Sequence, residues 1–524
     1  MDEAGRISGC FSAGCVLQGV NPPPSSFLFP GSSLFYFLCH RLSFFNFGRI
    51  SPQITAALYV HRLFHQFAIL LLPFLYRVFF EQSEHIDLIL GDATERPLFC
   101  SHFSATLHPN QRQMVKGKIL NDPVYGFINV PYGLLFQLAE HPWFQRLRRI
   151  KQMSLAHYVY PGALHTRFHH ALGALHLMTE AVEVLRGKGV DISPEEAEGV
   201  QVAILLRDIG HGPFSHTLEH SLINVSHETL SLLFMEALDE AFDGRLTLAR
   251  RIFDGSHPKH FLHQLVSGQV DMDRMDYLNR DSFFTGVHEG VIGYDRIIKM
   301  LDVRDNELVV EEKGIYSVEK FLIARRLMYW QAYLHKTVLS AEQMLVKTIL
   351  RARQLTRSGH EVEAPRPLAF FLKNELTPEH FSQNREELLG NFALLDDHDV
   401  MSALKAWAFS NDPLLAYLSQ GILHRRLYKL ELSNEPFDPA YVNSIRHCVE
   451  RWNPFGAEAL PYLVFEGEEK NSAYDTSKDE VKILHKNGAV LPMSMSADYG
   501  IQSKLVTKYY LCYPKESVGP AMQM

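Results

Sequence analysis

The chain has 524 residues, of which 46% are hydrophobic and 21% are charged, proportions typical of a globular protein with a sizeable core. Its formal net charge of −8 argues against a protein that coats nucleic acid, so we expect no nucleic-acid partner. The six cysteines lack the spacing of a metal site or a disulfide framework, which is typical of a reducing compartment and predicts a cytoplasmic protein.

Residues 1–113 differ in composition from the rest of the chain. They contain no lysine but hold 15 of the 35 phenylalanines. Their longest apolar stretch, 63–76, has 14 residues, whereas a membrane-spanning helix needs about 20. We therefore expect no membrane association. We interpret 1–113 as an N-terminal extension of low order and of doubtful reality, and Met114 as the physiological start.

The sequence becomes regular from Lys118 onward. Residues 127–130 predict a short strand, and 140–153 predict a helix that carries several arginines. Apolar residues recur at helical spacing over 167–186.

The next helix has a clear start, because Ser193 can cap it, Pro194 suits its first position and Glu196 completes a capping box. We expect this helix to carry residues 207 and 208 at its C-terminal end. Further helices are predicted near 227–242, 257–281 and 317–356, and strands over 307–311 and 505–511.

Three segments combine imidazole and carboxylate groups. They are Arg167-Phe168-His169-His170, the run from Arg207 to His216 with Asp208-Ile209-Gly210-His211 inside it, and Asp271-Met272-Asp273 with Tyr277 one turn later. Such groups bind divalent cations in mixed nitrogen and oxygen sites. Their order and spacing resemble the HD superfamily, and more narrowly the deoxynucleoside triphosphate triphosphohydrolases: the sterile-alpha-motif/HD enzyme and its bacterial relatives. The resemblance covers roughly 116–355.

The resemblance implies a mainly α fold, with an HD-superfamily helical domain over 114–356 and a smaller α+β region over 357–524 for oligomer or regulatory contacts. It implies a dGTPase-like reaction in which a dNTP becomes a deoxynucleoside and triphosphate, assisted by a divalent metal (Mn, Mg, Fe, Zn or Ni). It also implies a homo-oligomer, either a dimer or a tetramer, and a regulatory nucleotide.

The resemblance also assigns roles by position. The metal ligands are His170, Asp208 and Asp273, and Arg207 stands at the fourth ligand position. The catalytic residues are His211, His216, Glu219 and His227. The substrate-binding residues are Gln152, Met153, Arg167, Tyr277, Asp281, Arg325, Tyr333 and Lys336. The residues of an allosteric nucleotide site are Lys118, Asn121, Gln145 and Arg148.

Arg207 makes the activity the open question, because a guanidinium has no lone pair for a metal and stays protonated. Either a weakly bound metal remains on the other three ligands, or Arg207 bonds Asp208 and replaces the cation with its own charge. The sequence leaves three functions open: a dNTP triphosphohydrolase with impaired turnover, a catalytically weak or inactive nucleotide-binding regulatory protein, and an HD phosphohydrolase acting on another phosphoester.

Overall fold

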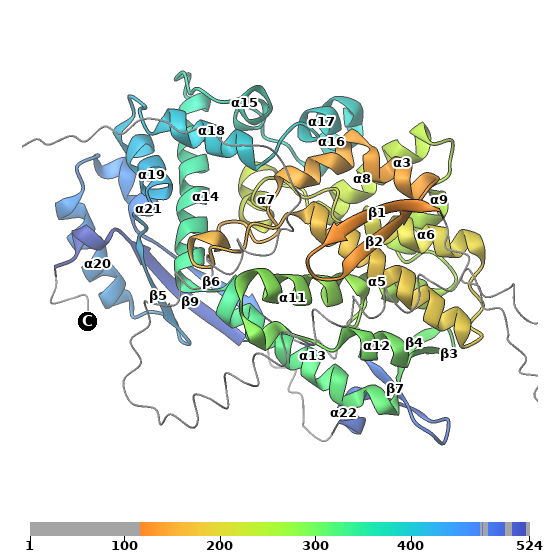
Figure 1. Ribbon diagram of the computed structural model, residues 1–524. Coiled ribbons are helices and arrows are strands. Elements are labelled where there is room, and N and C mark those ends of the chain that lie inside the picture. The colour runs from red at the N-terminus through yellow and green to blue at the C-terminus, as the bar shows by residue number, and fades with distance from the viewer. Residues whose placement is uncertain (1–115, 472–473, 475–479, 498–505, 520–524) are drawn as a thin grey trace, which may run out of the picture. The chain divides into compact units, whose positions relative to one another are not determined.

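The computed structural model describes residues 116–471, 474, 480–497 and 506–519 (Figure 1). The predicted extension 1–113 and the start at Met114 lie outside these residues. The described chain is mainly helical, as expected from the sequence. None of its helices is both long and apolar enough to cross a membrane.

The α-helices run in chain order from the N-terminal hairpin to the last strand. They are α3 (Leu134–Glu140), α4 (Pro142–Gln145), α5 (Arg167–Gly187), α6 (Pro194–Leu205), α7 (His216–Leu222), α8 (His227–Ala241), α9 (Thr247–Phe253), α10 (His260–Ser267), α11 (Met272–Thr285), α12 (Tyr294–Met300), α13 (Ile315–Met328), α14 (Lys336–Arg357), α15 (Arg366–Lys373), α16 (Pro378–Gln383), α17 (Arg385–Phe392), α18 (Asp397–Trp407), α19 (Pro413–Leu423), α20 (Pro439–Trp452), α21 (Leu460–Leu463) and α22 (Met493–Ser496).

The strands form three small sheets. They are β1 (Gly117–Asp122), β2 (Gly126–Pro131), β3 (Leu301–Arg304), β4 (Glu307–Glu311), β5 (Lys429–Ser433), β6 (Phe465–Asn471), β7 (Lys482–Leu484), β8 (Val490–Pro492) and β9 (Val506–Tyr513). The sheet orders are β1-β2, β3-β4-β7-β8 and β5-β9-β6. All strand pairs are antiparallel except β4 and β7, which pair in parallel.

Several predicted elements are confirmed, including β2, α5, α8 and β4. The capping box at the start of α6 is also present. The Ser193 hydroxyl accepts from the Glu196 amide at 3.2 Å, and the Glu196 carboxylate accepts from the Ser193 amide at 2.8 Å. The predicted strand 505–511 corresponds to β9, whose described part begins at Val506.

Three predicted helices are wrong because they are interrupted. The expected helix 140–153 is divided at Pro142 into α3, α4 and a short 3₁₀ helix, η1 (Arg146–Arg149). The buried Arg146 side chain donates to the carbonyls of Ile209 and Leu395, which holds this irregular segment in the core.

The expected helix 257–281 ends at Ser267 and restarts at Met272, because the Asp271 side chain caps α11 by accepting from the Arg274 amide at 2.7 Å. The expected helix 317–356 changes to a π-helical turn, η5 (Tyr329–Tyr333), between α13 and α14. Such turns frequently occur at functional sites.

Helix α5 packs against both α6 and α11 (Figure 1). Its inward face is almost entirely apolar, with Leu172, Leu175 and Met178 each buried. Gly173 permits the close approach to α11, since a Cβ there would lie 1.9 Å from the Asp276 carboxylate. This packing brings residues about 100 positions apart in the sequence to one place.

Candidate functional site

The three residues predicted as metal ligands lie together in the core. His170 lies on α5, Asp273 on the first turn of α11, and Asp208 in the turn after α6 rather than on that helix as expected. All three are buried, and their ligand atoms lie within 4.8 Å of one another. His170 Nε2 lies 3.0 Å from Asp273 Oδ1 and 3.6 Å from Asp208 Oδ2.

The other ring nitrogen of His170 is held by a residue that the sequence did not indicate. His170 Nδ1 lies 2.7 Å from Asp276 Oδ2, and Asp276 also accepts from Arg280 Nε at 3.0 Å. Burial alone would lower the pKa of His170, but hydrogen bonds to Asp273 and Asp276 and the charge of Asp208 outweigh burial and raise this pKa to about 10. His170 is therefore fixed in position from both sides.

Arg207 lies between the two carboxylates of this group. Its Nη1 is 3.1 Å from Asp273 Oδ1 and 3.4 Å from Asp208 Oδ1, while its Nε donates to the Val266 carbonyl at 3.2 Å. Burial opposes the charge of Arg207, but the neighbouring carboxylates, Asp273 first, raise its pKa above the usual value. Burial likewise opposes ionisation of Asp273, and the charge of Arg207 more than offsets this and lowers the pKa of that carboxyl.

A second arginine reaches one of these carboxylates, Asp208. Arg167 Nη1 donates to Asp208 Oδ2 at 2.5 Å, and Arg167 Nε donates to the Ser215 hydroxyl at 2.8 Å. Two guanidinium groups thus neutralise Asp208 and Asp273. The donor set does not fit a four-ligand metal centre, because Arg207 offers a positive charge and no lone pair at the fourth position. The remaining imidazole and two carboxylates would have to ligate a cation next to the positive charge of Arg207, which repels it.

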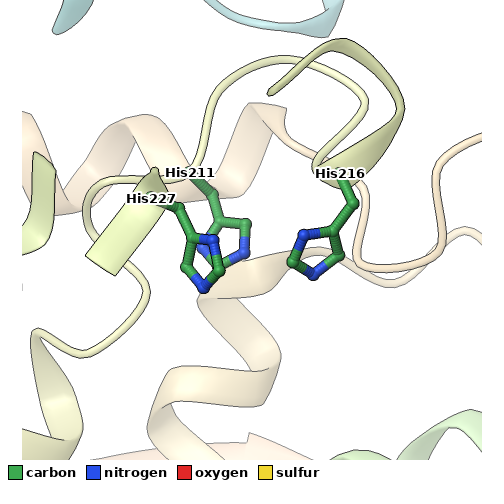
Figure 2. Close-up of side chains that lie close together, drawn as sticks. All are labelled: His211, His216 and His227. Atoms are coloured by element: carbon green, nitrogen blue, oxygen red, sulfur yellow. The ribbon is translucent and has the colours of Figure 1, made fainter. Parts of the chain in front are cut away.

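The predicted catalytic histidines form a second cluster (Figure 2). It adjoins the first, since His211 Nδ1 lies 3.7 Å from Asp208 Oδ1. His211 follows α6, His216 begins α7 and His227 begins α8. Glu219 joins two of them, with its oxygens 2.8 Å from Nδ1 of His216 and 2.8 Å from Nδ1 of His227. Burial would raise the pKa of Glu219, but these hydrogen bonds outweigh burial and lower it.

A cavity of about 580 Å³ lies beside both clusters. Most of the predicted site residues line it: Gln152, Met153, Arg167, His170, Arg207, Asp208, His211, His216, His227, Asp273, Tyr277, Asp281 and Tyr333. Glu219 is not in the lining and acts on it through His216 and His227. Two predicted substrate residues, Arg325 and Lys336, also lie outside the lining; Arg325 donates to Gln269 at 3.2 Å.

The polar end of the cavity is organised by Asp281. Its Oδ1 lies 2.7 Å from His165 Nε2, and its Oδ2 accepts from the Tyr333 hydroxyl at 2.6 Å. Glu342 also lines the cavity and was missed by the sequence; burial raises its pKa to about 7. No local motif distinguishes Glu342 from the other carboxylates of a long helix.

The residues predicted to bind a regulatory nucleotide lie on two neighbouring segments. Lys118 and Asn121 are exposed on β1. Gln145 ends α4, and its side-chain oxygen accepts from Arg148 Nε at 2.7 Å. The guanidinium of Arg148 lies 3.6 Å from the centre of the Phe168 ring. A regulatory role for these four residues stays a prediction.

Comparisons with known proteins agree with this architecture. Residues 292–362 match the family model of the HD associated region. A phosphohydrolase of known structure from Bacteroides thetaiotaomicron is 50% identical, with a TM-score of 0.73, over 76% of this chain and all of that one. The uncharacterised Bacillus subtilis protein YwfO is 29% identical over 430 residues, which cover 78% of this chain and 95% of YwfO.

A more distant similarity extends to human deoxynucleoside triphosphate triphosphohydrolase SAMHD1. It is 31% identical over 317 residues, which are 52% of this chain and 50% of SAMHD1. The chain thus spans about half the length of this relative. Phosphohydrolases of this type generally depend on a divalent metal, so the arginine at position 207 is a departure. Taken with the helical fold and the buried His-Asp-Asp group, these similarities show that the chain belongs to the HD family of phosphohydrolases related to the deoxynucleoside triphosphate triphosphohydrolases.

Proposed function

We propose that the cavity binds a deoxynucleoside triphosphate and that the chain hydrolyses it slowly, because Arg207 takes the place and the charge of the catalytic cation. The observation that carries this proposal is the contact of Arg207 Nη1 with Asp273 Oδ1 at 3.1 Å. A guanidinium bonded to this carboxylate neutralises the charge that would attract a metal, and it places a like charge beside the metal position.

The cavity has the size and chemistry for such a ligand. Small-molecule sites commonly enclose about 300–1,000 Å³, and this one encloses about 580 Å³. Arg167 and Arg207 line the cavity and have guanidinium N–H groups, besides those bonded to Asp208 and Asp273, that can donate to phosphate oxygens. Tyr277 and Tyr333 supply aromatic surface for the nucleoside. The deoxyribose is proposed to lie beside Gln152 and Met153, as the resemblance to dNTP triphosphohydrolases implies, and both residues line the cavity.

The chain's own residues can perform part of the reaction. Glu219 accepts from Nδ1 of His216 and His227, so each ring presents its Nε2 to a ligand. A proton on either Nε2 could pass to the 5′-oxygen as the deoxynucleoside departs. Arg207 cannot lower the pKa of a bound water as a metal ion does, so we expect the turnover to be slow.

The test is to restore the missing histidine. With Mn²⁺ or Mg²⁺ present, we expect Arg207→His to release tripolyphosphate from dNTPs at least about 10–100-fold faster than the unchanged chain, since lost metal ligation typically costs at least that factor. Arg251→His, which changes an exposed arginine on α9, is the matched control. It should release tripolyphosphate at the rate of the unchanged chain.

Equal, robust rates for the unchanged chain and Arg207→His would contradict the role given to Arg207. If Arg207→His cleaved nucleoside monophosphates or cyclic nucleotides but no dNTP, the chain would be a phosphohydrolase of a different phosphoester.

A further inference from the structure

The three histidines beside the cavity have a geometry that the hydrolytic role does not require. His211, His216 and His227 have ring centroids 4.0–5.1 Å apart, and their ligand atoms all lie within 4.8 Å of one another. Figure 2 shows the three imidazoles gathered side by side from three separate segments. Three imidazoles at this spacing form a nitrogen donor set.

Glu219 fixes which nitrogen of two of these rings is available. Its two oxygens lie 2.8 Å from Nδ1 of His216 and 2.8 Å from Nδ1 of His227, and Oε1 also accepts from the His227 amide at 2.8 Å. A carboxylate accepts only from a protonated nitrogen, so the nitrogen of each ring that can offer a lone pair is Nε2. Metal-bound histidines are oriented by a carboxylate in the same way.

His211 supplies the third donor and has an unmet requirement. Its side chain is only 2% exposed, and neither ring nitrogen forms a hydrogen bond with any residue that the structure describes. Nδ1 lies nearest to Asp208, at 3.7 Å from Oδ1, which leaves Nε2 for the other two rings. A buried polar atom without a partner costs about 1–3 kcal/mol, and a ligand at His211 would remove that cost.

We propose that His211, His216 and His227 bind one Zn²⁺ ion through Nε2, with its fourth coordination position open to the cavity. Imidazole donors favour Zn²⁺ over Mg²⁺, which prefers oxygen ligands. Zinc with three protein ligands and one exchangeable position is the arrangement of catalytic zinc sites. This site is separate from the His170 group. Zn²⁺ bound there would occupy Nε2 of His216 and His227 and so exclude proton donation from those atoms, which makes zinc binding and proton donation alternative roles of these rings.

The required movement is small. Zinc–nitrogen bonds of about 2.0–2.1 Å in a tetrahedron place the donor atoms about 3.4 Å apart. The present ligand atoms, which lie within 4.8 Å of one another, therefore need to close by at most about 1.4 Å. The His216 side chain is 66% exposed and is free to make this adjustment, whereas His211 is held in the core.

The test measures zinc binding directly and needs no turnover. The full chain is stripped with EDTA and titrated with Zn²⁺ against a chromophoric chelator, and Co²⁺ is used to detect a tetrahedral absorption band. We expect one Zn²⁺ per chain, with affinity lowered at least 10-fold in His216→Ala and His227→Ala. Glu219→Gln should weaken binding by about 10–100-fold, because the orienting charge is lost.

Two further variants locate the ion. Asp273→Asn disturbs the His170 group and should bind Zn²⁺ as the unchanged chain does. His447→Ala removes an exposed histidine that pairs with Glu450. It should also leave zinc binding unchanged. Because His216 is exposed, His216→Ala should keep its fold, which circular dichroism checks. Unchanged zinc affinity in His216→Ala, or loss of zinc in Asp273→Asn, would overturn the proposal.

Discussion

Arg207 and a metal-ligating histidine make opposite demands on a carboxylate. A histidine shares a cation with the neighbouring carboxylate, whereas a guanidinium is itself the cation. The sequence left both a weakened metal site and a replaced charge open. The contacts with Asp208 and Asp273 favour replacement of the metal cation by the charge of Arg207, because the guanidinium of Arg207 bonds to an oxygen of each carboxylate.

The motif residues could be predicted from the sequence, but their supporting partners could not. His170, Asp208 and Asp273 stand in segments with a recognisable order and spacing. Asp276 orients His170 from one turn farther along α11, where it is one acidic residue among several. Only the packing of α5 against α11 reveals which of these carboxylates faces the imidazole.

The raised pKa of His170 predicts how stability depends on pH. An unfolded histidine has a pKa of about 6.5, whereas that of His170 in the folded chain is about 10. The stabilisation is thus complete below about pH 6.5 and is lost as the pH rises through 10. The free energy of unfolding should fall over this window, by at most about 1.4 kcal/mol per pH unit for one proton.

Urea unfolding across pH 6–10 provides the measurement. His170→Gln cannot titrate and should show a shallower decline than the unchanged chain. Parallel pH profiles for the two proteins would show that His170 is not the responsible group.

At the scale of elements, local signals predicted where helices begin better than where they are interrupted. Ser193 and Glu196 form a capping box that predicts the start of α6 from four consecutive residues. The break between α10 and α11 depends on Asp271, whose side chain is buried and caps the second helix. Apolar residues continue at helical spacing across this break, so the sequence pattern predicts one helix where the structure has two.

The cap of α6 should contribute measurably to stability, because this helix leads directly into the turn that carries Arg207 and Asp208. We expect Ser193→Ala to lower the free energy of unfolding by about 1 kcal/mol. Ser193→Asp retains a side-chain acceptor and serves as the matched variant. If chemical denaturation gave equal losses for the two variants, the hydrogen bond to the Glu196 amide would not be the cause.

At the scale of the described molecule, long-range pairs connect the N-terminal hairpin and the C-terminal strands to the helices around the site. Arg280 on α11 donates to Asp122 at the end of β1 at 2.7 Å, although the two residues are 158 positions apart. Strand β7, near the C-terminus, pairs with β4. Neither partnership follows from local sequence, since no periodicity or motif specifies it.

The buried Arg280 should be the most costly of these connections to break. Arg280→Met leaves Asp122 buried without its cation and leaves Asp276 with His170 alone, and breaking such a pair costs about 3–5 kcal/mol. Arg251→Ala on the exposed side of α9 should change stability by less than about 0.5 kcal/mol. A loss below 1 kcal/mol for Arg280→Met in equilibrium unfolding would contradict this account of the core.

The whole molecule is also predicted to form a dimer or tetramer, which sedimentation velocity would establish.

Binding of a dNTP, by contrast, is proposed to depend on charge within a single chain. Its most direct test is equilibrium binding of a non-hydrolysable dNTP analogue to EDTA-treated protein, comparing the unchanged chain with Arg207→Ala. We expect binding without metal by the unchanged chain, and affinity at least 10-fold weaker in Arg207→Ala, since a charge-assisted hydrogen bond contributes about 1.5–3 kcal/mol. Strict dependence of the unchanged chain on Mn²⁺ or Mg²⁺, with no loss in Arg207→Ala, would contradict the claim that Arg207 replaces the cation.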